Sequence, residues 1–405
     1  ISGRPQAPDK NGKPYEVTLT AANNGGKGVR KVRLSVAQMP PGLAGSYTAR
    51  LERHAAINGG LGGRLDFTVT PTGSLSGVLF LGGTALKFTG VLEVDVNGVA
   101  LPKVEELRIA RPGKPVAPPP LVVGFSIEDN LVKAGTISDG AQTLDFTGWR
   151  NVWSLAANRA DKFAGPHNFV LEMPSSIPDV PRGYSYGTAQ VSATGVVTYT
   201  GMTADKEKIT GSALLGPDGK LVFHQALYKN TPQGSLNGEM LIEEGALADD
   251  PADNLLSGSL SWVRPAMSKP RLYAAGFGPV DLAVLGGRYQ APALPLGLAG
   301  PGRVRLVFDH AGLPASREPG ITLDVDAKGK LIPPLKADNL AGTTLKITAA
   351  SGLFSGKFAL EDSNPVSPPA VMKRPVSFQG VMVPVSGELR GYGWVILQQL
   401  PSILE

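Results

Sequence analysis

The sequence predicts an all-β protein built from three tandem antiparallel meander repeats that close as small barrels or sandwiches. Three observations support this fold class. The 405 residues include 51 Gly and 35 Pro, which interrupt helices and form turns. The segments between these breaks alternate apolar and polar residues, as half-buried strands do. Glycine-rich openings at residues 45, 165 and 287 are spaced by about 120 residues, which indicates an internal repeat.

Residues 1–40 are expected to form a hairpin of their own. The segment 15–21 alternates, Asn23-Asn-Gly-Gly26 has the composition of a turn, and the segment 32–36 alternates again. Two strands alone cannot bury a core, so this hairpin needs other strands to be stable.

Three β repeats are expected to follow, with boundaries at 41–160, 161–280 and 281–405. Their openings are Gly45-Ser-Tyr47, the segment 164–169, and Gly287-Arg-Tyr289. About seven or eight short strands per repeat, joined by tight turns, favour an up-and-down meander, which removes its edges by closing or by stacking. Two short stretches, 157–162 and 246–256, are the nearest candidates for helix.

Small polar residues followed by Gly recur inside the strand patterns. Glycine within a strand indicates a bulge or a sharp bend, and a simple hairpin turn is the equally favoured alternative. The steps are Ser76-Gly77, Thr89-Gly90, Thr210-Gly211, Asn237-Gly238, Ser257-Gly258 and Ser355-Gly356.

Composition excludes several classes of protein. The chain has no Cys, so a disulfide framework, a thiolate metal site and a Cys nucleophile are unavailable. No apolar run approaches the roughly 18 residues of a membrane helix. The sequence starts at Ile1 without a charged leader, so we expect any signal peptide to be removed or to lie upstream.

Charge is concentrated at the N-terminal end. Residues 1–54 carry nine Lys or Arg and three acids, a net charge of +6, whereas the whole chain carries +5. A nucleic-acid binder would interleave stacking aromatics, and only Tyr15 and Tyr47 lie in this stretch, so no nucleic-acid partner is expected. A solvated strand face is favoured over a contact with a polyanion or a surface glycan.

Two parts of the sequence resemble known bacterial protein families. The stretch ISGRPQAPDKNGKPYEVTLTAANNGGKGVRKVRLSV resembles the last two strands of the immunoglobulin-like domains of the He-PIG type, which occur in tandem in large bacterial surface proteins. The runs YGTAQVSATGVVTYTG, LLGPDGKLVFHQALY and GYGWVILQQLP resemble a β-rich region that follows such domains in very large secreted proteins of Verrucomicrobia-type bacteria. The resemblance implies an exported chain, extracellular or at the cell surface, that is covalently part of a longer parent protein. It brings no activity.

Paired aromatic residues are the candidates for a glycan site. Trp149 and Trp153 flank Arg150 four residues apart, and two exposed rings beside a guanidinium suit stacking on sugars. Tyr184 and Tyr186 form a weaker version of the same pattern. The alternative, which we favour, is that each Trp caps the core of its repeat, as Trp262 and Trp394 would in the others.

Calcium is the one cofactor that an acidic loop suggests. Oxygen ligands cluster most densely in the segment 243–253, although no cofactor is required by the sequence. The candidate ligands are Glu243, Glu244, Asp249, Asp250 and Asp253. The segment 324–335 begins like an EF-hand loop, but Lys328 and Leu335 occupy ligand positions, so a hairpin turn is expected at Asp326 to Gly329.

Three functions remain open from the sequence. A non-catalytic structural or adhesive segment of a large surface or secreted protein is favoured, with neighbouring protein modules or surface glycans as partners. A carbohydrate-binding module is the alternative, and a polysaccharide-active enzyme on a β scaffold is the third. We expect no enzymatic activity, because the sequence shows neither a nucleophile elbow nor a phosphate loop nor a carboxylate pair with a defined spacing.

Overall fold

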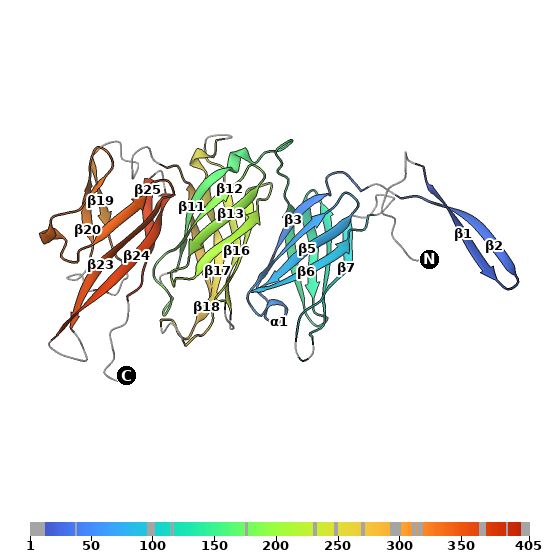
Figure 1. Cartoon of the computed structure of the whole chain (residues 1–405), viewed down its shortest axis with the longest axis horizontal. Helices are drawn as coiled ribbons and strands as arrows, with labels where there is room; N and C mark the ends of the chain where they lie inside the picture. Colours follow the sequence, from blue (N-terminus) through green and yellow to red (C-terminus); the bar gives the residue numbers. More distant parts are fainter. Residues whose placement is uncertain are drawn as a thin grey trace. The chain divides into compact units, whose positions relative to one another are not determined.

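Figure 1 shows a computed structural model of the chain, which describes residues 13–36, 39–94, 102–113, 115, 117–174, 177–229, 233–246, 250–268, 272–291, 301–309, 313, 319–363, 370–385 and 388–397. The prediction of an all-β antiparallel fold is confirmed. The described helical segments include one α-helical turn, α1 (Ala55–Asn58), and the short 3₁₀ turns η1 (Asp161–Phe163), η2 (Pro251–Asp253) and η5 (Lys336–Asp338).

The chain divides into two compact units, residues 1–152 and 153–405. The first unit begins with a two-stranded antiparallel hairpin, β1 (Tyr15–Asn23) and β2 (Gly26–Leu34). Its pairing places Val17 opposite Val32 on one face, whereas Glu16 and Lys31, 3.7 Å apart, lie on the other. The predicted hairpin and its turn are therefore present.

The rest of the first unit is an eight-stranded antiparallel sheet, which we call barrel 1 (Figure 1). Its strands are β3 (Gly45–Leu51), β4 (Gly63–Val69), β5 (Ser74–Leu81), β6 (Thr84–Val91), β7 (Lys103–Ile109), β8 (Leu121–Glu128), β9 (Leu131–Ser138) and β10 (Thr143–Arg150). Their order is β6-β5-β4-β3-β10-β9-β8-β7, so the first and last strands of the meander pair with each other. Just beyond β6, Glu93 and Lys103 exchange two backbone hydrogen bonds, and the sheet is nearly closed.

The second unit begins with a sheet of the same topology, which we call barrel 2. Its strands are β11 (Gly165–Glu172), β12 (Ser185–Val191), β13 (Val196–Met202), β14 (Lys208–Leu214), β15 (Lys220–Leu227), β16 (Gly234–Glu243), β17 (Leu255–Arg264) and β18 (Phe277–Arg288). Their order is β14-β13-β12-β11-β18-β17-β16-β15. Each barrel is thus an up-and-down meander with its seam between the fourth and fifth strands.

The third repeat differs from the first two. Strand β18 runs to Arg288, so Gly287 lies at the closing end of barrel 2 and does not open a third repeat. The boundary expected at residues 280 and 281 falls inside this strand. The following strands form a three-stranded and a four-stranded sheet, and we call the latter the C-terminal sheet. They are β19 (Gly302–Leu306), β20 (Ile321–Val325) and β21 (Leu331–Ile332), then β22 (Thr344–Thr348), β23 (Leu353–Ser363), β24 (Val371–Val385) and β25 (Glu388–Val395).

Equivalent hydrogen bonds relate the three repeats at one turn. The amide of Leu92 donates to Gly73 O at 2.9 Å in barrel 1, and that of Leu215 donates to Gly195 O at 2.8 Å in barrel 2. In the C-terminal sheet, the amide of Met382 donates to Gly352 O at 2.8 Å. Strands β22 to β24 therefore correspond to β4 to β6, and the internal repeat extends to the C-terminal sheet over these three strands.

Alternating apolar side chains fill the interior of both barrels. In barrel 1, Phe67 stacks on Tyr47 at 4.8 Å between ring centroids and lies 4.9 Å from Phe125. In barrel 2, Tyr199 and Phe223 are 4.6 Å apart, and the interior cavity beside them has a volume of only about 10 Å³. These interiors are packed cores, and the cavity in barrel 2 is about the smallest that holds one water.

The glycine steps have a different cause from the one expected. Gly77 pairs directly with Phe88 and Gly356 with Phe378, both within regular register, so neither is a bulge nor a hairpin turn. A Cβ on Gly77 would lie 2.6 Å from the Phe88 ring and 2.3 Å from Asp66 O. Glycine is required there because the ring of the neighbouring strand occupies the position of its side chain.

Candidate functional site

The two tryptophans that were candidates for stacking on a sugar are both buried, in agreement with the packing role that the sequence favoured. Trp149 lies in β10 and is 7% exposed, and Trp153 is 9% exposed. Trp153 belongs to the second unit, where its indole N–H donates to Gly216 O at 3.3 Å and its ring meets Phe163 edge-on at 5.8 Å. Trp153 thus packs at barrel 2 and not at the end of the first repeat. Arg150 closes β10, where its Nε donates to Asn130 Oδ1 at 2.8 Å.

The two tyrosines of the weaker candidate pair lie where the C-terminal sheet meets barrel 2. Tyr186 is 7% exposed and belongs to an apolar cluster with residues of β24 and β25. Tyr184 lies 4.9 Å from Tyr392, and its hydroxyl donates to Glu172 Oε1 at 3.1 Å. Tyr184 is half-buried, and Tyr186 and both indoles are buried, so glycan binding through these candidate aromatics loses its main support.

The described candidate calcium ligands do not converge on one point, and three of them bond to other groups of the protein. Glu244 pairs with Lys162 at 2.5 Å, and Glu243 accepts a hydrogen bond from Ser257. Asp250 caps η2 by accepting from the amide of Ala252 at 2.9 Å, and Asp253 is half-buried at its end. Asp249 lies outside the described residues, within which no group of three potential ligands is found. The calcium hypothesis stays a prediction.

The segment that begins like an EF-hand loop is a turn between β20 and β21. The amide of Gly329 donates to Asp326 O at 2.9 Å, and Asp326 Oδ1 accepts from the amides of Lys328 and Lys330. The carboxylate is therefore occupied by its own turn, as the expectation of a hairpin turn requires.

The contact between barrel 2 and the C-terminal sheet was not visible in the sequence. Its apolar core combines the outer faces of β11 and β12 with β24 and β25. The buried members are Val170, Tyr186, Ala204, Val381, Val383 and Trp394. We call this set the docking cluster. Val170, Val381 and Val383 are each 0% exposed, as core residues are.

One amide locks this contact. Asn168 is 1% exposed, and its Nδ2 donates to Ser351 O and to Met382 O, each at 2.9 Å. Nearby, the hydroxyl of Tyr289 donates to Ala349 O at 2.5 Å. The turn between β22 and β23 is thus held against barrel 2 by side-chain to backbone bonds, which specify its position more strictly than apolar contact does.

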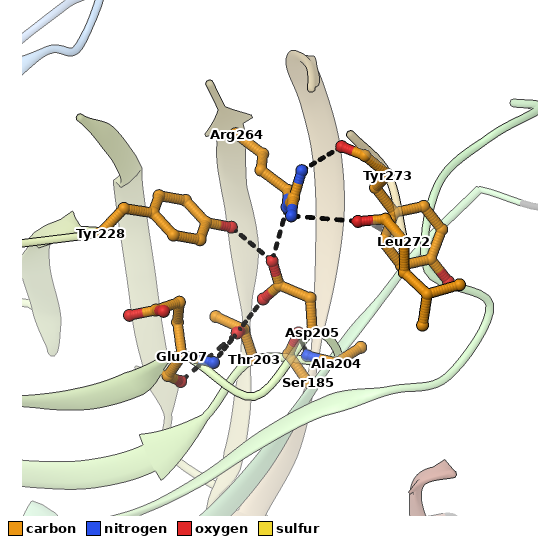
Figure 2. Close-up of polar contacts among 9 residues, drawn as sticks. All are labelled: Ser185, Thr203, Ala204, Asp205, Glu207, Tyr228, Arg264, Leu272 and Tyr273. Carbon is orange, nitrogen blue, oxygen red and sulfur yellow. Dashed lines mark hydrogen bonds and ion pairs between the residues drawn. The ribbon is translucent and has the colours of Figure 1, made fainter. Parts of the chain in front are cut away.

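A buried polar cluster lies at one end of barrel 2 (Figure 2). Asp205 comes from the turn between β13 and β14, Arg264 ends β17, and Tyr228 follows β15. Arg264 Nε lies 2.9 Å from Asp205 Oδ2, and the two side chains are 1% and 4% exposed. Arg264 also donates to the carbonyls of Leu272 and Tyr273 in the loop before β18.

The carboxylate of this cluster is fully used by neighbours. Tyr228 donates its hydroxyl to Asp205 Oδ2 at 2.6 Å, and Thr203 donates to Asp205 Oδ1. Burial, reinforced by the Asp205 charge, raises the pKa of Tyr228 well above its usual value, so the phenol remains a donor. Acid and base are paired away from solvent, and the cluster ties together three connections of barrel 2 instead of presenting reactive groups.

Carboxylates on the outer face of barrel 1 are also paired. Asp66 accepts from Thr48 at 2.7 Å and lies 2.8 Å from Arg64, whereas Glu52 lies 2.5 Å from Arg50. An arrangement for glycoside hydrolysis needs two carboxyl groups facing one cleft. These groups face cationic partners instead.

Comparison with known proteins adds no family or relative to this description of the site. No protein-family model matches the chain, and no curated protein is similar to it. In the part of the chain that the structure describes, no helix is long and apolar enough to cross a membrane.

Proposed function

We propose that this chain is a non-catalytic structural and adhesive β-repeat segment of a large exported bacterial protein, secreted or displayed at the cell surface. The observation that carries the proposal is the docking cluster with Asn168. Barrel 2 uses part of its outer face to hold the next repeat. Function in such an array lies in the stacking of repeats and in the surfaces they leave open.

The filled barrel interiors support the same function. Small-molecule pockets have volumes of about 300–1,000 Å³. The cavity inside barrel 2 is about 10 Å³, so a ligand carried in its interior is not part of the proposal.

Mechanical unfolding tests the structural part. With the chain held by its two ends, barrel 1 should unfold in one cooperative step, because its first and last strands pair. The 106 residues from Gly45 to Arg150 would release about 350–380 Å of chain. Gradual extension at low force, without such a step, would contradict a structural role.

An activity screen tests the non-catalytic part. The purified chain, incubated with neutral and acidic polysaccharides, should release no reducing ends or unsaturated products. Product formation that disappears in Asp66→Asn or Glu52→Gln, and persists in the surface control Glu388→Gln, would establish an enzyme and overturn the proposal.

A further inference from the structure

A hollow of about 330 Å³ opens on the outer face of barrel 2, beside the docking cluster. Its floor is formed by β12 and β13, and its wall by Ala350 and Ser351 of the turn that Asn168 holds in place. Both parts belong to the second unit.

Uncharged polar side chains follow one another across the strands of this face. Asn168 lies opposite Thr188, Thr188 opposite Thr200, and Thr200 opposite Thr210. A second row places Gln190 opposite Thr198. Adjacent strands are about 4.8 Å apart, so the first row offers a hydrogen-bonding side chain at that interval along a line perpendicular to the strands. We call the part of these rows that lines the hollow, with Ser351, the hydroxyl groove.

Three threonines of the hydroxyl groove are available to a ligand. Among the described residues, the hydroxyls of Thr188, Thr198 and Thr200 make no intramolecular hydrogen bond. Thr198 and Thr200 are exposed, and Thr188 is half-buried. The bonds from Asn168 to Ser351 and Met382 fix the back of the groove, so little ordering is needed on binding.

The chemistry of the lining selects the class of ligand. None of the residues that line the hollow carries a charge. An ionic polymer would find no counter-charge there, and an apolar ligand would remove the threonine hydroxyls from water without replacing their hydrogen bonds. A neutral polyhydroxylated chain can exchange hydrogen bonds with each row while its less polar faces cover the exposed threonine methyl groups.

The first row of this face has a different chemistry in barrel 1, whereas the second row keeps hydroxyl side chains, with Thr68 opposite Ser76. Its equivalent row runs from Thr48 to Asp66 and then Val78 and Lys87, and Arg64 is paired with Asp66. The second, third and fourth positions of the row, which are threonines in barrel 2, are Asp66, Val78 and Lys87 in barrel 1. The first row of the groove is therefore a property of barrel 2 and not of the repeat in general.

From these observations we propose that the hydroxyl groove binds an uncharged polysaccharide that lies across strands β11 to β14. The proposal rests on the adhesive part of the proposed function and assigns that part to one surface. It involves none of the buried aromatics predicted from the sequence.

Titration calorimetry and a glycan array with the full chain test the proposal. The probes are cellohexaose, xylohexaose, mannohexaose, laminarihexaose and chitohexaose, with heparin as a charged comparison. We expect at least one neutral hexasaccharide to bind, with an affinity that salt does not change. In the double variant Thr188→Val, Thr200→Val, the loss of two hydrogen bonds should weaken binding at least about tenfold.

Two further variants make the result decisive. Thr68→Val with Thr89→Val removes two exposed hydroxyls from barrel 1 and should leave binding unchanged. Ala350→Arg fills the hollow from its wall and should abolish binding even if the threonine variant folds poorly. The proposal is overturned if no neutral probe binds, if the groove variants bind as the wild type does, or if only heparin binds. Such a failure leaves the pulling and activity tests untouched, so it is distinguishable from failure of the structural role.

Discussion

Barrel 1 and barrel 2 share a topology and differ in the residues on their outer faces, which the topology does not determine. Both close an up-and-down meander through pairing of the first and last strands. At the outer positions of the first two strands, barrel 1 has Arg50 opposite Arg64, whereas barrel 2 has Val170 opposite Tyr186. The interior pattern is sufficient for the barrel, and the outer residues determine what each barrel can hold. This agrees with the general separation of fold from function.

The ends of the barrels differ in the same way. In barrel 1 the loop after β3 is organised by Asn58, whose side chain makes hydrogen bonds to backbone groups of His54, Glu52 and Gly62. In barrel 2 the equivalent end holds the ion pair of Arg264 and Asp205. The end of barrel 1 is held by a neutral amide and the end of barrel 2 by a buried ion pair. Mutations at the two ends should therefore change the stability of the barrels by different amounts.

The largest effect is expected from Arg264→Ala. Removing one partner of a buried ion pair leaves the other charge unpaired and costs about 3–5 kcal/mol of unfolding free energy. The second unit should lose this stability, and the first unit should not. Urea unfolding followed by tryptophan fluorescence measures both, with Arg390→Ala as the control because its pair with Glu388 is exposed. Equal effects of the two variants would remove the distinction between the barrel ends.

The next effect is a dependence of stability on pH that is specific to barrel 2. Burial, with a smaller contribution from Arg288, lowers the pKa of His167 from 6.5 to about 4. Between these values the unfolded chain binds a proton that the folded chain does not. Stability should therefore fall by about 2–3 kcal/mol as the pH drops from about 6.5 to 4, and no further from this group below that range.

The matching position in barrel 1 supplies the comparison. Tyr47 occupies the equivalent place in β3, and burial raises its pKa to about 12, so it does not titrate in acid. Unfolding between pH 7 and 4 should show the steeper loss in the second unit, and His167→Leu should reduce that slope. An unchanged slope in the variant would show that other groups cause it.

A smaller effect should come from Gly77→Ala in barrel 1. The new methyl would meet Asp66 O at 2.3 Å and the Phe88 ring at 2.6 Å, and such overpacking costs about 1–3 kcal/mol. Gly28→Ala is the control, because nothing lies within 4 Å of a Cβ there. Thermal unfolding should separate the two variants. Comparable melting temperatures would reject the steric account of the glycine steps.

Local sequence patterns predicted many of the strands and turns, but they did not predict the contact between barrel 2 and the C-terminal sheet. Alternation such as Leu121 to Ile127 and turns such as Thr70 to Gly73 predict strands and hairpins because side chains alternate across a strand. The burial of β11 on both faces is visible in the sequence, because Phe169, Val170 and Leu171 form a continuous apolar run. Nothing in that run says which strand covers its second face. The partner, β24, lies about 200 residues away.

The third repeat and the candidate site show a second limit. The opening at Gly287 matches the others in sequence because glycine is needed both to start a first strand and to let a last strand approach its neighbour. A Cβ on Gly287 would lie 2.5 Å from Asn254 O, beside the neighbouring strand β17. Spacing alone cannot separate these causes. Trp149 and Trp153 left a similar ambiguity, because the sequence gives the residue type and not what covers the ring. The structure shows both buried, as the favoured packing role requires.

The central claim, that barrel 2 and the C-terminal sheet form one body, is tested most directly by hydrogen exchange in β24. Val170→Asp places a carboxylate in the docking cluster, whereas Val196→Asp places one on the same barrel at a site that is 36% exposed. A buried unpaired carboxylate costs about 3 kcal/mol or more, so Val170→Asp should lower protection of residues 381–385 at least about a hundredfold. Val196→Asp should leave it near the wild-type level, with β15 and β16 protected in both. Equal protection of residues 381–385 in the two variants would contradict the claim.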